Sequence, residues 1–441
     1  MNHQSSPSPN ETSRREFLRT STVAALGGAM AANLAFPYVS SGAGAETIKV
    51  GLIGCGGRGT GAASQALGAD KNVALTAMGD TFPEQLQRAH DALSKQAGAK
   101  VTVAPDQRFV GLDAYEKVLN SGVDVVVLAT PPGFRPQHLK AAIDAGKHVF
   151  CEKPMATDSF GVRSVLESVE KAKQKKLALV AGFCWRYDYA RREFFKRIHD
   201  GAIGDIKAVY ATYYTGPVKP MPPANKRPAG MSDVEWQVRN WYNFVWLCGD
   251  GLVEQCVHSI DKVAWAMRDV PPLKAVAVGG RQTPNGEGNI YDHIAVNYEY
   301  ANGVRAFVGQ RQISGCYSQT ADYLMGTKGN GTIGASRSPK VAVEITGENT
   351  WQQGPAATDM YQVEHNELFA SIRAGKPIND GIRMSYSTLM AIMGRMAAYT
   401  GQEITWEQAL NSEDRLVPEN LKWDMSLPIA PMAIPGKTKM A

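Results

Sequence analysis

The sequence predicts an α/β fold in which a doubly wound parallel sheet forms the first of two domains. Strand-like and helix-like segments alternate from Ile48 to Gly182, a pattern typical of parallel strands joined by crossover helices. A glycine-rich turn, from Gly54 to Gly59, directly follows the first strand-like segment. The length of 441 residues favours two domains and leaves ample chain for a large core.

The first 45 residues precede this pattern and resemble an export signal. The run from Ser13 to Leu18, S-R-R-E-F-L, is typical of twin-arginine signals. The weakly apolar run Thr20 to Ala35 is too short, and too poor in Leu and Ile, to span a bilayer stably. Because Ala43-Gly44-Ala45 fits a processing site, we expect the twin-arginine export machinery as a partner and a mature chain that starts at Glu46. Retention as an uncleaved anchor is the alternative.

An exported, and in particular a periplasmic, location is therefore expected, with no stable membrane span after cleavage. Composition agrees with a globular protein, since 44% of the residues are hydrophobic and 20% are charged. The net charge of +5 comes without basic clusters, which argues against nucleic acid as a partner. The six cysteines include no C-x-x-C pair, so we expect buried thiols and no metal site.

The elements of the first domain, residues 46–183, follow one another in a regular order. Short apolar runs predict strands at Ile48 to Ile53, Val73 to Met78, Val123 to Ala129, His148 to Cys151 and Leu177 to Ala181. Helical patterns lie between them at Thr60 to Leu67, Pro83 to Gln96, Ala114 to Asn120, Arg135 to Ala145 and Asp158 to Gln174. Residues 184–441 form the second domain.

The glycine-rich turn has the spacing of a dinucleotide-binding loop, G-x-G-x-x-G. Gly54 makes the tight turn out of the strand, Gly56 lets the backbone approach a pyrophosphate, and Gly59 allows close packing of the helix. The helix N-terminus offers free N–H groups to the phosphates. We therefore expect cofactor contacts from Gly54, Gly56, Gly57, Arg58 and Gly59, although Arg58 could instead face solvent.

An acidic residue follows at the end of the second strand candidate. Asp80 would accept hydrogen bonds from the adenosine ribose hydroxyls and repel an additional phosphate there. NAD is therefore expected rather than NADP.

A second group of residues follows the fourth and fifth strand candidates. Thr130 and Pro131 leave the fourth strand, and Glu152 and Lys153 end the fifth, at the edge where open α/β sheets bind ligands. Lys153 would meet the nicotinamide end, where a desolvated lysine can exchange a proton with a hydroxyl while hydride moves. Thr130, Pro131, Glu152 and Lys153 complete the predicted cofactor contacts.

These motifs resemble the Gfo/Idh/MocA oxidoreductases, the family of glucose–fructose oxidoreductase and inositol dehydrogenase. The match rests on the glycine loop, the T-P-P at Thr130 and the G-K-H-V-x-x-E-K-P that ends at Pro154. The resemblance implies an N-terminal Rossmann domain and a C-terminal α/β domain with a large, mostly antiparallel open sheet, whose back commonly pairs subunits. It also implies a homo-oligomer, either dimer or tetramer, with Lys153 as the catalytic residue and Arg186 near the cofactor.

The family's second catalytic stretch, D-x-G-x-H-x-x-D, matches E-Q-C-V-H-S-I-D from Glu254 to Asp261, with Glu and Cys in place of Asp and Gly. If Gly249 to Asp261 opens a helix, Glu254 and His258 share one face. His258 is then the acid/base partner of Lys153, and Glu254 is a substrate or lysine contact. A structural histidine is the alternative for His258, and a metal site with Cys256 is disfavoured because adjacent helical positions converge poorly.

Other polar residues of the second domain are candidates for substrate binding. Arg239 and Asn240 lie among aromatic residues, a setting that suits a sugar, so we expect them to face the substrate together with Lys153, Glu254 and His258. The Pro-rich end after Leu416 is expected to wrap a neighbouring subunit or the first domain.

The sequence thus predicts an exported NAD-dependent oxidoreductase that transfers hydride between a tightly bound nicotinamide and a hydroxyl of a carbohydrate, polyol or sugar derivative. Outside the cytoplasm a second substrate would have to reoxidise the cofactor in place. Two alternatives stay open: a glycosidase-like enzyme that uses transient oxidation and elimination, and a non-catalytic, cofactor-bearing binding protein.

Overall fold

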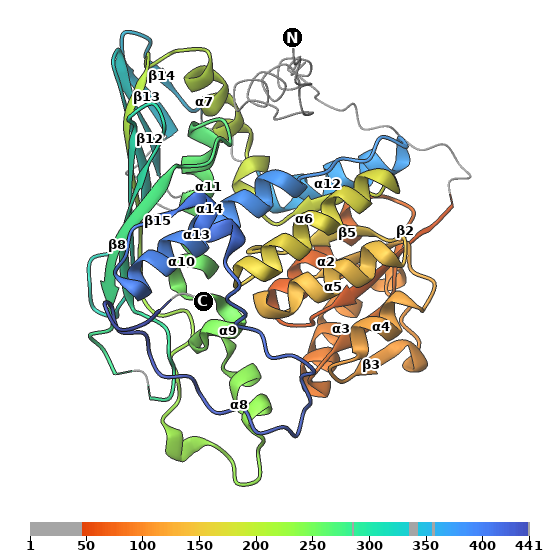
Figure 1. Ribbon diagram of the computed structural model, residues 1–441. Coiled ribbons are helices and arrows are strands. Elements are labelled where there is room, and N and C mark those ends of the chain that lie inside the picture. The colour runs from red at the N-terminus through yellow and green to blue at the C-terminus, as the bar shows by residue number, and fades with distance from the viewer. Residues whose placement is uncertain (1–45, 285, 335–342, 355–357, 440–441) are drawn as a thin grey trace, which may run out of the picture. The chain divides into compact units, whose positions relative to one another are not determined.

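The computed structural model describes residues 46–284, 286–334, 343–354 and 358–439 (Figure 1). The predicted export signal, residues 1–45, lies outside the described residues. Within the described ranges, no helix is both long enough and apolar enough to cross a membrane.

The first domain contains the parallel sheet that the sequence predicts. Six strands pair in the order β3-β2-β1-β4-β5-β6, and every neighbouring pair is parallel. The order steps outward in both directions from β1, which confirms the doubly wound fold. The strands are β1 (Ile48–Ile53), β2 (Val73–Asp80), β3 (Arg108–Val110), β4 (Val125–Leu128), β5 (His148–Cys151) and β6 (Leu179–Ala181).

The crossover helices begin and end close to the predicted positions. Helix α2 starts three residues earlier than expected, at Gly57, because its first turn is part of the glycine loop itself. Short three-residue strand β3 was not expected from the sequence. The helices are α2 (Gly57–Ala69), α3 (Pro83–Ala97), α4 (Ala114–Leu119), α5 (Arg135–Asp144) and α6 (Ser159–Gln174).

The second domain is built on a nine-stranded sheet in the order β14-β13-β12-β11-β7-β10-β9-β8-β15. Only the β7–β10 pair is parallel, so the sheet is mostly antiparallel, as the family resemblance implied. Its strands are β7 (Ile206–Thr215), β8 (Lys274–Gly280), β9 (His293–Glu299), β10 (Arg305–Gln312), β11 (Gln319–Gly326), β12 (Gly329–Gly334), β13 (Val343–Gly347), β14 (Trp351–Gln352) and β15 (Ile404–Thr405).

Helices cover one face of this sheet and join it to the first domain. Helix α13 is buried along most of its length and contacts β8 and β9 on one side and α6 on the other (Figure 1). The helices are α7 (Tyr189–His199), α8 (Asp233–Arg239), α9 (Val245–Cys248), α10 (Gly251–Glu254), α11 (Val257–Ala266), α12 (Met360–Arg373), α13 (Gly381–Thr400) and α14 (Trp406–Asn411).

The last part of the chain returns to the first domain. Helix α12 packs against α2, and its Leu368 and Phe369 are buried in one cluster with the strands of the parallel sheet. The extended tail that follows α14 runs past α8 (Figure 1). Its Leu416 N–H donates to Asp158 of the first domain, and its Leu427 N–H donates to Asp233 of α8. The tail thus lies on its own chain, on both the first domain and α8.

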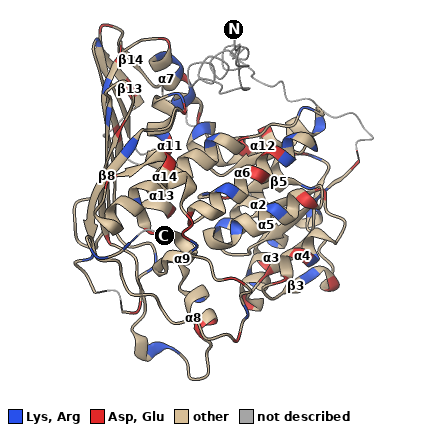
Figure 2. Cartoon of the chain, in the orientation of Figure 1, with Lys and Arg blue, Asp and Glu red and all other residues tan. Residues whose placement is uncertain are grey.

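Charged residues of both signs are interspersed over the described elements (Figure 2). Several form ion pairs one helical turn apart, as Lys140 does with Asp144 and Lys196 with Asp200. Such exposed pairs contribute little to stability.

Candidate active site

The glycine loop has a backbone geometry that excludes side chains at two positions. Gly54 has φ of +93°, and a Cβ there would lie 2.7 Å from the backbone of Ala129 and Thr130. A Cβ on Gly59 would lie 1.9 Å from the Gly54 carbonyl oxygen. These contacts hold the start of α2 against the ends of β1 and β4.

The same loop leaves open space where a pyrophosphate would lie. A Cβ on Gly56 or Gly57 would meet no atom within 4 Å, and no side chain caps the N-terminus of α2. An open backbone at a helix N-terminus binds phosphate well, because free N–H groups and the helix dipole both favour an anion. The loop therefore fits a dinucleotide.

Asp80 lies at the end of β2, beside this loop. Its carboxylate accepts hydrogen bonds from the Cys55 N–H at 2.6 Å and the Phe82 N–H at 2.8 Å, which fix its orientation. Burial raises the pKa of Asp80. A carboxylate oriented at this position is suited to a ribose diol, as predicted.

Phe82, two residues after Asp80, is packed by Trp423, which the sequence analysis did not select, and by Arg239, a predicted substrate contact. Trp423 of the tail meets its ring edge-on at a centroid distance of 5.7 Å, and the Arg239 guanidinium lies 4.0 Å from the ring centroid. The tail and α8 thus border the predicted adenosine end of the site. No local pattern near Trp423 indicated this, because the contact joins residues more than 300 positions apart.

Arg239 and Asn240 have partners within the protein, and their predicted contacts with substrate stay a prediction. Arg239 forms ion pairs with Glu84 of α3 and Glu235 of its own helix. Asn240 is buried and donates to the Trp236 carbonyl at the end of α8. Their polar groups are used for packing because α8 lies against Phe82 and α3, a placement that proximity in sequence could not indicate.

Lys153 ends in a buried ion pair at the carboxyl end of β5. Only 9% of its surface is exposed. Its Nζ donates to the Glu254 side chain at 3.0 Å and also to the Glu254 backbone carbonyl. The structure therefore brings together two of the three predicted catalytic residues, although they are 101 positions apart in the sequence.

Glu152 and Arg58 form a second buried network beside Lys153. Arg58 pairs with Glu152 and with Glu364 of α12, so its guanidinium does not face solvent freely. Burial, above all, raises the pKa of Glu364. Arg58 thus connects the glycine loop to the E-K-P segment and to α12.

Thr130 and Pro131 lie at the end of β4, next to the glycine loop. The Thr130 hydroxyl lies 3.1 Å from Nδ1 of His138, and Pro131 begins the short helix η3 (Pro132–Phe134). Their position agrees with the predicted nicotinamide side, and their contact with the cofactor stays a prediction.

His258 is partly buried, and its ring centroid lies 6.3 Å from that of Phe183 and 6.4 Å from that of Trp185. Its Nδ1 has no hydrogen-bond partner among the described residues. Burial, and then the positive charge of Lys153, hold the pKa of His258 well below its ordinary value. The imidazole is therefore neutral at neutral pH, with a ring nitrogen open to a partner.

The single helix predicted from Gly249 to Asp261 is divided in two. Helix α10 ends at Glu254 and α11 begins at Val257, and the N–H groups of both Gln255 and Cys256 bond to the Gly251 carbonyl. The break lets the Glu254 carbonyl turn away from the helix and accept from Lys153. Glu254 and His258 therefore lie on different helices, and not one turn apart on the same helix as expected.

Arg186 has a different environment from the one that the resemblance implied. Its guanidinium forms hydrogen bonds to both carboxylate oxygens of Asp261 and to Asp269, and it lies 5.1 Å from the Trp265 ring centroid. These contacts use its donors inside the second domain. Arg186 thus has partners within the protein for these donors, and its contact with the cofactor stays a prediction.

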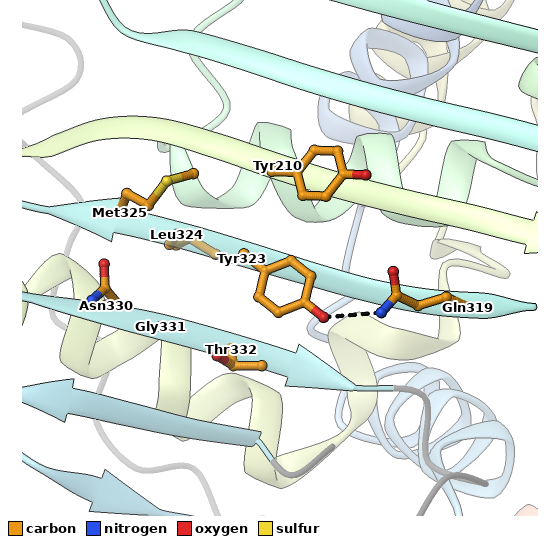
Figure 3. Close-up of a pocket in the computed structure, with 8 residues that line it drawn as sticks. All are labelled: Tyr210, Gln319, Tyr323, Leu324, Met325, Asn330, Gly331 and Thr332. Carbon is orange, nitrogen blue, oxygen red and sulfur yellow. Dashed lines mark hydrogen bonds between the residues drawn. The ribbon is translucent and has the colours of Figure 1, made fainter. Parts of the chain in front are cut away.

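One surface hollow lies away from these residues. It has a volume of about 500 Å³ and lies on the outer face of the second sheet, around Tyr210 and Tyr323 (Figure 3). A smaller cavity of about 100 Å³ lies beside Tyr242 and Gln312. Among the described residues, no cluster of His, Cys, Asp and Glu could hold a metal ion.

Comparison with known proteins finds a family model that matches the first domain, and several relatives. Residues 48–183 match the family model described as "Oxidoreductase family, NAD-binding Rossmann fold" (GFO_IDH_MocA). Inositol 2-dehydrogenase of Rhizobium meliloti is 26% identical over 349 residues, which cover 76% of this chain and 93% of that protein.

Solved structures show the same fold. Aldose-aldose oxidoreductase from Caulobacter crescentus, complexed with glycerol, superimposes with a TM-score of 0.62 at 19% identity, over 82% of this chain and 100% of that chain. Levoglucosan dehydrogenase in complex with NADH and levoglucosan gives a TM-score of 0.62 at 20% identity, with the same coverage. Residues 48–183 are therefore similar to the NAD-binding Rossmann domain of the Gfo/Idh/MocA oxidoreductases.

Proposed function

We propose that this NAD-dependent oxidoreductase acts on a CH–OH group of a sugar, polyol or sugar derivative. The observation that carries the proposal is the pairing of Lys153 with Glu254 at the carboxyl end of β5, beside the glycine loop. Relatives named inositol 2-dehydrogenase and levoglucosan dehydrogenase support this substrate class. When bound, NAD would supply the hydride acceptor or donor.

Lys153 and Glu254 would position the reacting hydroxyl and its proton. Glu254 holds Nζ of Lys153 in one place, with Lys153 and Glu254 almost excluded from solvent. A fixed ammonium or amine beside a hydroxyl can orient it and exchange a proton with it. We assign this role to Lys153, and to Glu254 the role of holding it.

His258 would complete the proton path. Because its pKa lies well below the ordinary value, its imidazole is neutral and can accept a hydrogen bond from a substrate hydroxyl. Since its Nδ1 has no partner in the described part of the chain, this atom is available to a substrate hydroxyl. The hydroxyl proton would pass to Lys153 or to His258.

Cofactor binding is assigned to the glycine loop and the strand ends around it. Gly54 and Gly59 shape the loop, Gly56 and Gly57 offer the open backbone, and Asp80 is oriented for the ribose. Thr130, Pro131 and Glu152 lie at the ends of β4 and β5, on the predicted nicotinamide side.

We further propose that the protein is exported through the twin-arginine pathway with its cofactor already bound. The pattern S-R-R-E-F-L supports the export route. Because no soluble NAD pool is expected outside the cytoplasm, a second substrate would reoxidise the bound cofactor. Amino-terminal sequencing of protein from the periplasmic fraction tests this, and a start at Glu46 is expected.

A homo-oligomer, dimer or tetramer, is supported by the outer face of the second sheet. Tyr323 and Tyr210 lie side by side on adjacent strands (Figure 3). Phe307 is the register partner of Tyr210 on the other side, and Val278 on the same sheet is 72% exposed. Exposed apolar patches of this kind mark interfaces. Val278→Asp should shift the protein toward monomers in light scattering, whereas an unchanged mass would contradict this use of the face.

The central experiment measures both cofactor and turnover. Denatured protein should release NAD, and a carbohydrate and polyol screen should change the absorbance of the bound nicotinamide. Lys153→Met should keep the cofactor and lose turnover, whereas Lys140→Met, which removes an exposed lysine paired with Asp144, should retain both.

The two alternatives predict different outcomes. Cleavage of a glycoside without net NADH would indicate the glycosidase-like reaction with transient oxidation. Unchanged activity in the Lys153→Met variant, with ligand still bound, would indicate a cofactor-bearing binding protein.

A further inference from the structure

A buried carboxamide without hydrogen bonds lies on the inner face of the second sheet. Gln310 of β10 is only 2% exposed, and neither its Oε1 nor its Nε2 has a partner in the described ranges. Nε2 of Gln312, two residues along the same strand, also has none. Because buried polar atoms are nearly always paired, these amides indicate a missing ligand.

Gln310 is connected to the Lys153 pair through neighbouring side chains. It lies opposite Tyr213 in the β7–β10 register, and the Tyr213 hydroxyl donates to Gln255 at 3.1 Å. Gln255 in turn donates to the Glu254 carboxylate, whose other oxygen accepts from Lys153. The amides therefore border the same site as the catalytic pair.

Helix α10 places the two amides close together. A Cβ added to Gly251, the first residue of α10, would lie 2.6 Å from Nε2 of Gln310 and 2.9 Å from Oε1 of Gln312. Glu254 is the last residue of this same four-residue helix. Glycine at 251 thus lets α10 approach both carboxamides.

The cavity of about 100 Å³ opens beside Gln312. Tyr242 and Arg281 also line it. Burial, and then the charge of Glu254, raise the pKa of Tyr242. Arg281 donates to the carbonyls of Ile290 and Thr283, so its charge is already engaged by the protein.

We propose that Gln310 and Gln312 form a carboxamide wall that binds the non-reacting hydroxyls of an uncharged, polyhydroxylated ring. The inference rests on the proposed function and names its substrate class. A carboxamide offers a donor and an acceptor, which matches a hydroxyl. Residues i and i+2 of a strand lie roughly 6.6 Å apart on one face, a spacing that a six-membered ring with hydroxyls can bridge.

The test uses the full-length protein with bound NAD and three probes: myo-inositol, D-glucose and D-glucuronate. Gln310→Met and Gln312→Met should each raise KM for the neutral probe that is turned over by roughly tenfold, the value of one hydrogen bond. The kcat should change less, and NAD content should stay the same. Gln319→Met, on the outer face where Gln319 donates to Tyr323, is the matched control and should leave KM unchanged.

The melting temperature distinguishes a Gln310 that binds substrate from a Gln310 that has only a structural role. Gln310→Met should raise the melting temperature without ligand and reduce the additional shift that the neutral probe produces. A higher melting temperature with an unchanged KM would overturn the proposal, since water would then satisfy the amide. Preferred binding of D-glucuronate would overturn the uncharged class.

Failure of the proposed function would give a different result. If wild-type protein holds NAD but turns over none of the three probes, the shift in melting temperature on adding a probe decides whether the carboxamide wall binds it. A shift with myo-inositol or D-glucose that Gln310→Met removes would still support the carboxamide wall. No shift in the wild-type protein would overturn it.

Discussion

At the scale of single residues, the pairing of Lys153 with Glu254 contributes to the stability of the fold as well as to the proposed reaction. Both side chains are almost fully buried, so each charge depends on the other. Removing one partner of such a pair costs about 3–5 kcal/mol, because the remaining charge is left buried without compensation. The predicted catalytic lysine thus also joins the two domains.

This dependence predicts a non-additive result. Lys153→Met should lower the free energy of unfolding by about 3–5 kcal/mol, and adding Glu254→Gln should restore part of that loss. Urea unfolding of the single and double variants measures it. Strictly additive effects would show that the two side chains do not depend on each other.

His138 predicts a pH dependence of stability at the residue scale. Its ring stacks on Tyr115 at 4.2 Å, and burial lowers its pKa from 6.5 to about 3. A lowered pKa means that the unfolded chain binds the proton first. The stability is therefore complete above pH 6.5 and is lost as the pH falls toward 3.

Wild-type protein should lose about 2 kcal/mol through His138 between pH 6.5 and pH 4.5, because the loss approaches about 1.36 kcal/mol per pH unit only well below pH 6.5. His138→Gln should lack this slope. Unfolding curves for both proteins across this range measure the difference, and parallel curves would contradict the assignment.

At the scale of elements, two glycines near the start of α2, Gly59 and Gly61, differ in the space that they leave for a side chain. Gly59 faces the Gly54 carbonyl, whereas a Cβ on Gly61, on the same helix, would approach only the Arg58 side chain, at 3.5 Å. Two glycines two residues apart in one helix therefore have opposite tolerance for a methyl group.

Gly59→Ala should destabilise the protein by about 1–3 kcal/mol through overpacking and should reduce its NAD content. Gly61→Ala is the matched control and should stabilise the helix by about 0.5–1 kcal/mol. Thermal unfolding and nucleotide release measure both. Equal NAD content in the two variants would show that the loop tolerates a side chain at 59.

At the scale of the whole molecule, distant parts of the chain meet around the site. Glu364 of α12 reaches Arg58 in the glycine loop, and Trp423 of the tail packs on Phe82 beside Asp80. The tail therefore contributes to the border of the predicted adenosine end, although it is the last part of the sequence.

Trp423→Ala should accordingly speed the loss of NAD during dialysis, because Phe82 loses its packing partner. Ile434→Ala, at an exposed tail residue, is the control and should retain NAD as the wild type does. Equal retention in both variants would show that the tail has no part in holding the cofactor.

The sequence by itself determined the parallel sheet, the glycine loop, Asp80 and the position of Lys153 at a strand end. Each depends on local rules: the period of strands and helices, the backbone freedom of glycine, and the edge where parallel strands end. The relation of Lys153 to Glu254 was also accessible, because a motif matched a family pattern.

Only the tertiary structure decided which partners the polar side chains choose. Arg186 binds Asp261 and Asp269, Arg239 binds Glu84, and the Gln310 carboxamide has no partner among the described residues. Charged and amide groups pair with whatever the fold brings near them, and those neighbours come from distant segments. The local sequence pattern does not indicate such contacts. The proposed carboxamide wall could therefore be inferred only from the packing of β10 against α10.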